Sequence, residues 1–373
     1  MKNQAIFITS WPMTLGQGSG TALFVRALQK AVEANGSEVE MINPDLDSHD
    51  YVQFTLDRIR FNTQLAQDPR LSSASWLLGI DYDGYAIQRR NGQPFVASAR
   101  AVFADLVDTE PEPFKTMLRT QAYLEGQNLR ASDLVITPSR YAREKVIEYY
   151  QVPPERVHAV PNGIDLLEWN RHWNALPEPD PARRPTVLAV SKLYPRKKIA
   201  TLLQAVPLLR QRYPDIDVRI VGGGFEWEKL QKLTHELNVA DNVTWLGDIN
   251  ERRQVIGEFK NSHVFTHPSI QDAFANVCLE SMAASRAQVV SDAASMPDMV
   301  RQANSGLVVP PENPAALAQA LITLLEDESQ RQVLAANGRR FAQRMTWDKT
   351  ASRFLELVNP LLQPSNAVLE LAQ

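Results

Sequence analysis

Short apolar runs alternate along the chain with longer stretches in which apolar residues recur at helical spacing. Thr21–Asn35 is such a stretch, and Gly36 after it favours the end of a helix. Strands that alternate with helices predict parallel sheets covered by helices on both faces, which is the α/β fold class. In the first half, buried strands are predicted at Ala5–Ser10, Val39–Asn43, Ser75–Ile80, Phe95–Ala99 and Leu134–Thr137.

The same alternation restarts after a segment rich in proline. Residues 177–185 hold four prolines, which predict a stiff, extended connector. Strands are then expected at Thr186–Val190, Asp217–Val221, Val243–Leu246, Val264–Thr266, Gln288–Ser291 and Leu307–Val309. Helices are expected at Ile199–Tyr213, Glu226–Leu237, Glu251–Lys260, Val277–Ala284 and Pro314–Leu325. We therefore predict two domains, residues 1–178 and 183–345, followed by a helical tail.

Length and composition agree with this plan. A chain of 373 residues suits two domains, and 44% apolar with 22% charged residues is typical of a globular protein. The net charge of −4 argues against nucleic acid as a partner, because binding to a phosphate backbone needs a basic surface. Cys278 is the single cysteine, which excludes an internal disulfide and favours a reducing, cytoplasmic compartment.

The pattern does not predict a membrane-spanning protein. No run of about 18 apolar residues is present, and the N-terminal run Ala5–Thr9 is too short for a signal peptide. Peripheral contact with the inner face of a membrane stays open, although no strongly basic amphipathic segment argues for it. The sequence does not indicate an oligomeric state.

Three loops that follow predicted strands carry residues suited to a phosphate. Gly16–Thr21 holds glycines ahead of a helix, which let a backbone approach a phosphate closely, and a tight structural turn is an equal alternative. Ser191–Lys198 carries four positive charges, which form either a solvated patch or a clamp for a diphosphate. Gly222–Gly224 is foremost a structural turn. Ligands of open parallel sheets bind at the carboxyl ends of strands, so these loops are candidates for one site.

Two acids, Asp272 and Glu280, stand eight residues apart around a predicted helix start. Asp272 lies in the loop after a strand, and Glu280 lies about one turn into the helix. A helix N-terminus offers free N–H groups and a positive dipole end to an anionic or hydroxyl-rich ligand. A carboxylate one turn in suits the two hydroxyls of a ribose. Two unrelated surface acids at chance spacing are the alternative.

Two further motifs precede the proline-rich segment, namely Asp133–Ser139 and the turn Val160–Asp165, which reads Val-Pro-Asn-Gly-Ile-Asp. With the glycine loop, the lysine loop and the acid-x7-Glu loop in this order, the sequence resembles retaining glycosyltransferases of the GT-B architecture, family 4 (glycosyl transferases group 1). The resemblance implies two Rossmann-like, doubly wound parallel-sheet domains facing a central cleft. It also implies that the C-terminal helix, residues 346–373, packs back on the first domain.

The resemblance assigns roles to residues of the second domain. Lys192 and Lys197 would hold the diphosphate of a nucleotide sugar as catalytic residues, although Lys192 stands where Arg is usual. Asp272, the third catalytic position, would contact the hexose and stands where Glu is usual. Glu280 would bind the ribose. The remaining donor-binding positions are Gly18, Ser19, Gly20, Gly222, Gly224, Ile249, Phe274, Ala275, Asn276 and Val277.

Candidates for the acceptor side lie in the first domain. Arg100 stands where many members of the family carry a histidine. Its guanidinium would hold a phosphate or carboxylate of the acceptor, or would pair with Asp105 or Asp108. Asp81 and Asp83 follow a predicted strand and are assigned acceptor-side or structural roles in preference to metal ligation. The six histidines show no metal-ligand spacing, so no metal site is predicted.

The sequence therefore predicts an enzyme that moves a hexose from a UDP-, GDP- or ADP-hexose to a sugar, sugar-phosphate or lipid-linked acceptor, without a prosthetic group. No protein nucleophile is evident, so we expect front-face substitution in which the leaving phosphate accepts the proton of the acceptor. The departures at Asp272, Lys192 and Arg100 support an alternative, a catalytically inactive nucleotide-sugar-binding or regulatory protein. A glycoside hydrolase is disfavoured by the position of the acids around a helix start, and a nicotinamide dehydrogenase by the missing dinucleotide fingerprint.

Overall fold

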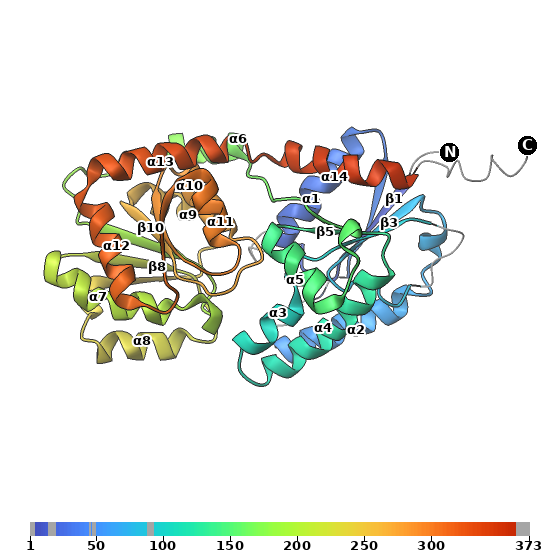
Figure 1. Cartoon of the computed structure of the whole chain (residues 1–373), viewed down its shortest axis with the longest axis horizontal. Coiled ribbons are helices and arrows are strands. Elements are labelled where there is room, and N and C mark those ends of the chain that lie inside the picture. The colour runs from blue at the N-terminus through green and yellow to red at the C-terminus, as the bar shows by residue number, and fades with distance from the viewer. Residues whose placement is uncertain (1–3, 14–19, 45, 47–49, 88–92, 363–373) are drawn as a thin grey trace, which may run out of the picture. The chain divides into compact units, whose positions relative to one another are not determined.

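The computed structural model describes residues 4–13, 20–44, 46, 50–87 and 93–362. The chain divides into two compact units, unit 1 (Met1–Gly163 with Trp347–Gln373) and unit 2 (Ile164–Thr346). Each unit is built on a six-stranded sheet in which all neighbouring strands are parallel (Figure 1). The predicted α/β class with two parallel-sheet domains is confirmed.

The sheet of unit 1 has the strand order β2-β1-β3-β4-β5-β6. Its strands are β1 (Gln4–Ile8), β2 (Glu38–Ile42), β3 (Trp76–Ile80), β4 (Phe95–Ser98), β5 (Leu134–Thr137) and β6 (Val157–Ala159). Its helices are α1 (Gly20–Ala34), α2 (Tyr51–Leu65), α3 (Phe103–Leu106), α4 (Phe114–Ala131), α5 (Arg140–Tyr150) and α14 (Trp347–Leu362). Helices α1 and α14 share one core with the sheet, and α2 and α4 lie together on its other face (Figure 1).

The sheet of unit 2 has the order β12-β11-β10-β7-β8-β9. Its strands are β7 (Thr186–Val190), β8 (Asp217–Val221), β9 (Val243–Gly247), β10 (Val264–His267), β11 (Ala287–Ser291) and β12 (Gly306–Val309). Its helices are α6 (Leu166–Asn174), α7 (Ile199–Arg212), α8 (Trp227–Glu236), α9 (Arg252–Asn261), α10 (Asn276–Ala283), α11 (Met296–Ala303), α12 (Pro314–Glu326) and α13 (Glu328–Ala342). One core contains α7, α8 and α12, the other contains α6, α9, α10 and α11, and α13 contributes side chains to both.

Local sequence explains these elements. The strands are short runs rich in Val, Ile and Leu because helices cover both faces of each sheet. In β7, Val187 and Leu188 are both fully buried and point into different cores. Helix α12 begins with Pro314 after Asn313, whose side chain accepts a hydrogen bond from the Ala316 N–H at 2.9 Å. A capping side chain followed by proline is a favourable helix start.

The boundary between the units differs from the predicted one. The chain enters unit 2 at Ile164, and residues 164–178, which were expected in the first domain, belong to unit 2. The reason is helix α6, which packs against α9. Its Trp169 is 1% exposed and lies against Phe259, with ring centroids 5.8 Å apart. A large buried aromatic ring ties this segment to the second core, and the proline-rich stretch follows within unit 2.

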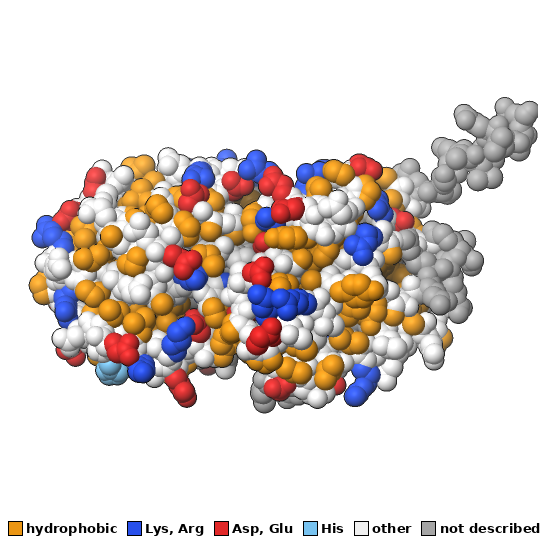
Figure 2. All heavy atoms as spheres, turned by 60° about the horizontal axis from the view of Figure 1, so that its bottom comes forward, with side chains coloured by type: hydrophobic (Ala, Val, Ile, Leu, Met, Phe, Trp, Pro, Cys, Tyr) orange, Lys and Arg blue, Asp and Glu red, His pale blue; other side chains and the backbone are white. Residues whose placement is uncertain are grey.

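The C-terminal helix α14 belongs to unit 1 and packs against α1. Phe354 on α14 is fully buried, and its ring lies 6.1 Å from that of Trp76 on β3. None of the helices in the described part of the chain is long and apolar enough to cross a membrane. On the face drawn in Figure 2, positive and negative side chains are interspersed among hydrophobic and neutral ones.

Candidate functional site

The carboxyl edge of the sheet in unit 2 brings two separate loops together. Strands β7 and β10 are neighbours, but the helices that follow them, α7 and α10, lie in different cores. Their C-terminal ends therefore form a topological switch point, which is where such sheets bind ligands. The loop after β7, residues 191–198, is tied to the loop after β10, residues 268–275, because Ile270 N–H donates to the carbonyl of Arg196 at 2.8 Å.

Lys197, Asp272 and His267 form a cluster at this switch point. Lys197 Nζ lies 2.5 Å and His267 Nε2 lies 2.7 Å from one oxygen, Oδ2, of Asp272. The side chains of Lys197 and Asp272 are 10% and 20% exposed, so the pair is largely buried but still reaches the surface. Burial alone would raise the pKa of Asp272, but the ammonium of Lys197 and the hydrogen bond from His267 lower that pKa below its ordinary value. Asp272 is therefore held as a carboxylate.

Lys192 lies on the same loop as Lys197 but is half exposed. Its Nζ is 2.7 Å from Asp248 Oδ1, which places it at the end of β9. The nearby glycines make room for this loop: a Cβ atom at Gly222 would lie 1.8 Å from the carbonyl oxygen of Ser191, and Gly224 is crowded by the same loop. Gly222 also has a φ of +133°, which glycine adopts without strain. Glycine is therefore required at both positions for structural reasons.

Glu280 pairs with an arginine that the sequence analysis did not consider. Its Oε1 accepts a hydrogen bond from Nη1 of Arg252, on α9, at 2.9 Å, and its side chain is 14% exposed. The guanidinium of Arg252 also lies 5.4 Å from the ring centre of Trp169. The pair holds one carboxylate oxygen of Glu280 in place. The sequence contained no signal for it, because α9 and α10 are separated by a strand and a loop.

The N-terminus of α10 contains the other donor-side residues. The helix begins at Asn276, and Ala275 at the cap position offers no side-chain hydrogen bond. Asn276 N–H donates to the carbonyl of Phe274 at 3.0 Å. Phe274, Val277 and Ile249 are partly buried against the core that contains α10. The backbone of this turn thus follows Asp272 directly at the edge of the sheet.

In unit 1 the switch point lies between β1 and β3. Asp83, which follows β3, contacts Ser10, which follows β1, at this point. Asp83 is fully buried. Its carboxylate accepts hydrogen bonds from the N–H and Oγ of Ser10, each at 2.6 Å, and from Nδ2 of Asn62 at 2.8 Å. Arg58, on α2, lies 3.7 Å from Asp83 Oδ2 and is also fully buried. All of these contacts are internal.

Asp81 is equally enclosed. Its side chain accepts hydrogen bonds from Nε1 of Trp11 at 2.6 Å and from the N–H of Arg100 at 2.7 Å. Burial raises the pKa of Asp81 above its ordinary value despite the nearby charge of Arg58. The backbone of Asp81 has a φ of +55°, a left-handed conformation that these side-chain bonds hold in place.

Arg100 follows β4 and is 9% exposed. Its Nη2 donates to Oδ1 of Asn162, and its guanidinium lies 3.7 Å from the ring centre of Phe24. Asp105 and Asp108, the carboxylates considered above as its partners, bind other side chains. Nη1 of Arg100 has no hydrogen-bond partner within the described ranges. Burial lowers the pKa of Arg100 to about 9, although the nearby charge of Asp81 acts in the opposite direction.

The remaining predicted site residues lie in the glycine loop. Gly18 and Ser19 fall outside the residues that the structure describes, and Gly20 is the first residue of α1. Among the described residues, no three His, Cys, Asp or Glu side chains are grouped so that they could hold a metal ion.

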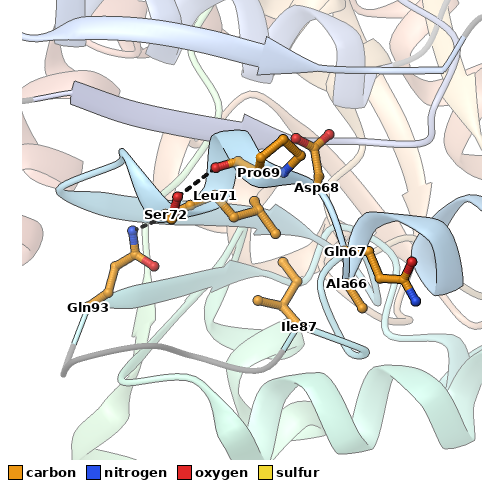
Figure 3. A pocket seen from close by; sticks show the side chains of 8 residues that line it. All are labelled: Ala66, Gln67, Asp68, Pro69, Leu71, Ser72, Ile87 and Gln93. Carbon is orange, nitrogen blue, oxygen red and sulfur yellow. Dashed lines mark hydrogen bonds between the residues drawn. The ribbon is translucent and has the colours of Figure 1, made fainter.

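A pocket of about 190 Å³ lies in unit 1, beside the C-terminal end of α2 (Figure 3). Its lining contains a hydrogen bond from Ser72 Oγ to the carbonyl of Pro69 at 2.7 Å. It is lined by Ala66, Gln67, Asp68, Pro69, Leu71, Ser72, Ile87 and Gln93. None of the residues assigned above to a donor or acceptor lines it, and its volume is below the range usual for small-molecule sites.

Two Rossmann-like units, with charged side chains gathered at the carboxyl edge of the second sheet, define the GT-B class of nucleotide-sugar-dependent glycosyltransferases. Comparison with known families agrees with this class. The family described as "Glycosyl transferases group 1" matches residues 177–341, and "Glycosyltransferase Family 4" matches residues 18–167. The two matches follow one another along the chain, and the chain belongs to the glycosyltransferases of group 1 and family 4.

Individual relatives are distant. The chain is 27% identical over 256 residues to the GDP-mannose-dependent alpha-(1-6)-phosphatidylinositol monomannoside mannosyltransferase of Mycobacterium tuberculosis, and the match covers 61% of this chain and only 62% of that protein. It is 29% identical over 333 residues to the D-inositol 3-phosphate glycosyltransferase of Thermomonospora curvata, covering 82% and 75%. The solved sucrose-phosphate synthase of Thermosynechococcus elongatus shares the fold, with a TM-score of 0.76, 20% identity and coverage of 96% and 99%.

Proposed function

We propose that unit 2 binds a nucleotide-diphosphate hexose and that the protein transfers the hexose to a hydroxyl acceptor with retention of anomeric configuration. The observation that carries the proposal is the cluster of Lys197, Asp272 and His267 at the switch point of β7 and β10. A partly exposed ammonium beside an ionised carboxylate offers a cation for a diphosphate and an acceptor for sugar hydroxyls.

Each part of the donor has a candidate partner. Lys197 and the more exposed Lys192 would contact the diphosphate. Asp272 uses Oδ2 for Lys197 and His267, while its Oδ1 makes no hydrogen bond within the described ranges and would accept one from the hexose. The first backbone N–H groups of α10 would contact the hexose and phosphate. Glu280 has one oxygen on Arg252 and would turn the other to the ribose hydroxyls. A UDP, GDP or ADP base would lie by the backbone near Ile249.

The reaction that suits these groups is a front-face substitution. The oxygen of the acceptor hydroxyl forms a bond to the anomeric carbon on the side from which the diphosphate departs. The bond between that carbon and the phosphate oxygen breaks, and its electron pair stays on the diphosphate. The leaving phosphate oxygen takes the proton of the acceptor hydroxyl. Lys197 and Lys192 would lower the barrier because negative charge grows on the diphosphate in the transition state.

Unit 1 would bind the acceptor. Arg100 supports an acceptor that carries a phosphate, because its Nη1 is unpartnered in the described structure and its charge is largely buried. Both curated relatives described above have names with a phosphate-bearing substrate, an inositol phosphate or a phosphatidylinositol monomannoside. A sugar phosphate or a phospholipid-linked sugar would therefore suit this side. For Asp81 and Asp83 we propose a structural role, since their contacts are internal.

Replacement of Glu280 by Gln tests the donor site. The variant Glu280→Gln keeps an oxygen for Arg252 but cannot accept two ribose hydroxyls as a carboxylate does, so nucleotide affinity should fall by about tenfold. A thermal-shift screen of UDP, GDP and ADP would first select the nucleotide that stabilises the wild-type protein most. Isothermal calorimetry with that nucleotide would then measure its affinity for each variant. Glu251→Gln, an exposed acid next to Arg252, is the matched control. Unchanged affinity in Glu280→Gln would remove the ribose role.

A measurement of turnover distinguishes an active glycosyltransferase from an inactive nucleotide-sugar-binding protein. The wild-type protein should consume a UDP-, GDP- or ADP-hexose when a phosphorylated sugar acceptor is added, and product NMR should show the anomeric configuration of the donor. Nucleotide binding without turnover for any donor and acceptor would instead favour the inactive nucleotide-sugar-binding protein. An inverted product would overturn the retaining mechanism.

A further inference from the structure

His267 occupies an unusual place for a buried histidine. It is the last residue of β10, and its ring lies almost parallel to that of Phe265, with an interplanar angle of 10° and centroids 6.4 Å apart. Its side chain is 3% exposed. The ring therefore has little freedom to move, and its Nε2 is directed at Asp272, five residues later in the chain.

The hydrogen bond from His267 orients the carboxylate of Asp272. A carboxylate only accepts hydrogen bonds, so the Nε2 of a neutral His267 must carry the proton. Burial lowers the pKa of His267, which keeps the ring neutral near pH 7. Nε2–H and the Lys197 ammonium both bind Oδ2 of Asp272, and together they prevent rotation of the carboxylate group. Oδ1 is thereby left for another partner.

This second donor matters because Asp272 is one methylene shorter than the Glu that is usual at this position. A shorter side chain reaches less far from the loop, and Lys197 alone would leave it free to swing. His267 adds a contact from the end of the strand, at the base of the same loop. A carboxylate held by two donors keeps both its own Oδ1 and the bound ammonium in defined places.

We propose that His267 is a positioning residue for hexosyl transfer: its Nε2–H holds the shortened carboxylate of Asp272, and through it the ammonium of Lys197, in the geometry that transfer needs. The inference rests on the proposed function of the Lys197 and Asp272 cluster. Because His267 Nε2 lies 2.7 Å from Asp272 Oδ2, an acid longer by one methylene at this position would meet the imidazole.

A double-mutant cycle tests the proposal. His267→Leu removes the donor at similar size and should lower kcat by at least about tenfold, because small misplacements of reacting groups are costly. Asp272→Glu alone should also lose activity, since the longer acid meets the imidazole. The double variant His267→Leu, Asp272→Glu should recover most of kcat, a non-additive result that a purely structural role would not give. His267→Gln, whose amide can still donate, should retain a larger kcat than His267→Leu.

Two measurements separate the possible failures. If the wild-type protein transfers a hexose but His267→Leu has the same kcat, or if the losses in the double variant simply add, the positioning role is overturned and the proposed function stands. If the wild-type protein has no turnover, the proposed function and a role of His267 in transfer both fail, and ¹⁵N NMR of the ligand-free protein still tests the hydrogen bond from His267 to Asp272. That spectrum should show a neutral imidazole protonated at Nε2, whereas protonation at Nδ1 would overturn the hydrogen bond to Asp272. Melting temperatures within a few degrees of the wild-type value would show that the variants are folded.

Discussion

The two sheets end in switch points with opposite properties. In unit 1, between β1 and β3, Arg58 and Asp83 are both 0% exposed, and their contacts are internal. In unit 2, between β7 and β10, Lys197 and Asp272 are 10% and 20% exposed. Both places hold a cation and a carboxylate at the carboxyl edge of a parallel sheet. Only the second pair is accessible from the surface of its unit, so only it suits a role in ligand binding.

Aromatic side chains account for the difference. The guanidinium of Arg58 lies close to aromatic rings, 4.3 Å from the centre of Trp11 and 4.2 Å from that of Tyr82. The cation–π contacts of Arg58, and the hydrogen bonds that Asp83 accepts from Ser10 and Asn62, offset the loss of water around these charges. Nothing comparable covers the ammonium of Lys197 in the described part of unit 2. A charged pair at a switch point can therefore serve the fold or a ligand, depending on how deeply the pair is buried.

The largest effect should come from Arg58→Leu. This change leaves the carboxylate of Asp83 buried without its cation, which should lower the free energy of unfolding of unit 1 by about 3–5 kcal/mol. Arg60→Leu, on the exposed side of the same helix, should cost less than about 0.5 kcal/mol. Urea unfolding followed by peptide-resolved hydrogen exchange would report unit 1 separately. If Arg58→Leu lowers the free energy of unfolding by less than about 1 kcal/mol, the pair of Arg58 and Asp83 is not a structural one, and its contrast with Lys197 and Asp272 fails.

Lys197→Ala should act mainly on catalysis. Loss of the ammonium should lower kcat by about 100-fold, because charge on the leaving diphosphate would lose a preorganised partner. The matched control is Lys198→Ala, since Lys198 pairs with the exposed Glu312 and should have near wild-type activity. Steady-state kinetics with the preferred nucleotide sugar would measure both. Near wild-type turnover in Lys197→Ala would remove the lysine from the mechanism.

The smallest expected effect is a dependence of the stability of unit 1 on pH. Glu125 in unit 1 is buried, and burial raises its pKa to about 8, whereas Asp272 in unit 2 has a lowered pKa. Between its ordinary value of 4.5 and about 8, Glu125 binds a proton in the folded state that the unfolded chain has released. The stability of unit 1 should therefore fall as pH rises through this window, by at least about 1 kcal/mol.

Glu125→Gln should flatten this dependence, because the amide does not titrate. Urea unfolding of unit 1 at pH 5, 6.5 and 8 would show it, and Glu144→Gln, an exposed acid on α5, is the control that should leave the slope unchanged. Equal slopes for Glu125→Gln and the wild-type protein would show that the carboxyl is ionised in the fold.

Much of the fold could be predicted, and the exceptions have physical reasons. The expected strand Thr186–Val190 matches β7, and the expected helix Val277–Ala284 differs from α10 by one residue at each end. Helix α2 was harder to see, because Arg58 and Asn62 face the interior and interrupt its apolar stripe. Unit 2 begins at Ile164, ahead of the proline-rich segment, because the packing of Trp169 depends on distant residues, whereas proline-rich composition is a local property.

The candidate site was only partly visible in the sequence. Lys197 and Asp272 were assigned to one site, and they are in contact across 75 positions. The sequence shows no metal-ligand spacing for His267 and the other five histidines, and it contains no signal for the contacts of His267 or Arg252. The sequence does not reveal which residue a side chain contacts, because that depends on which strands are neighbours in the sheet.

The sequence by itself determined the alternation of strands and helices, the parallel sheets and the loops that hold charged residues, because these depend on residues close together in the chain. Only the tertiary structure decided which loops meet. The strand order placed β7 beside β10 and β1 beside β3, and the packing of side chains around each edge left one charged pair accessible and buried the other. Contacts and burial depend on residues far apart in the chain, so no local pattern contains them.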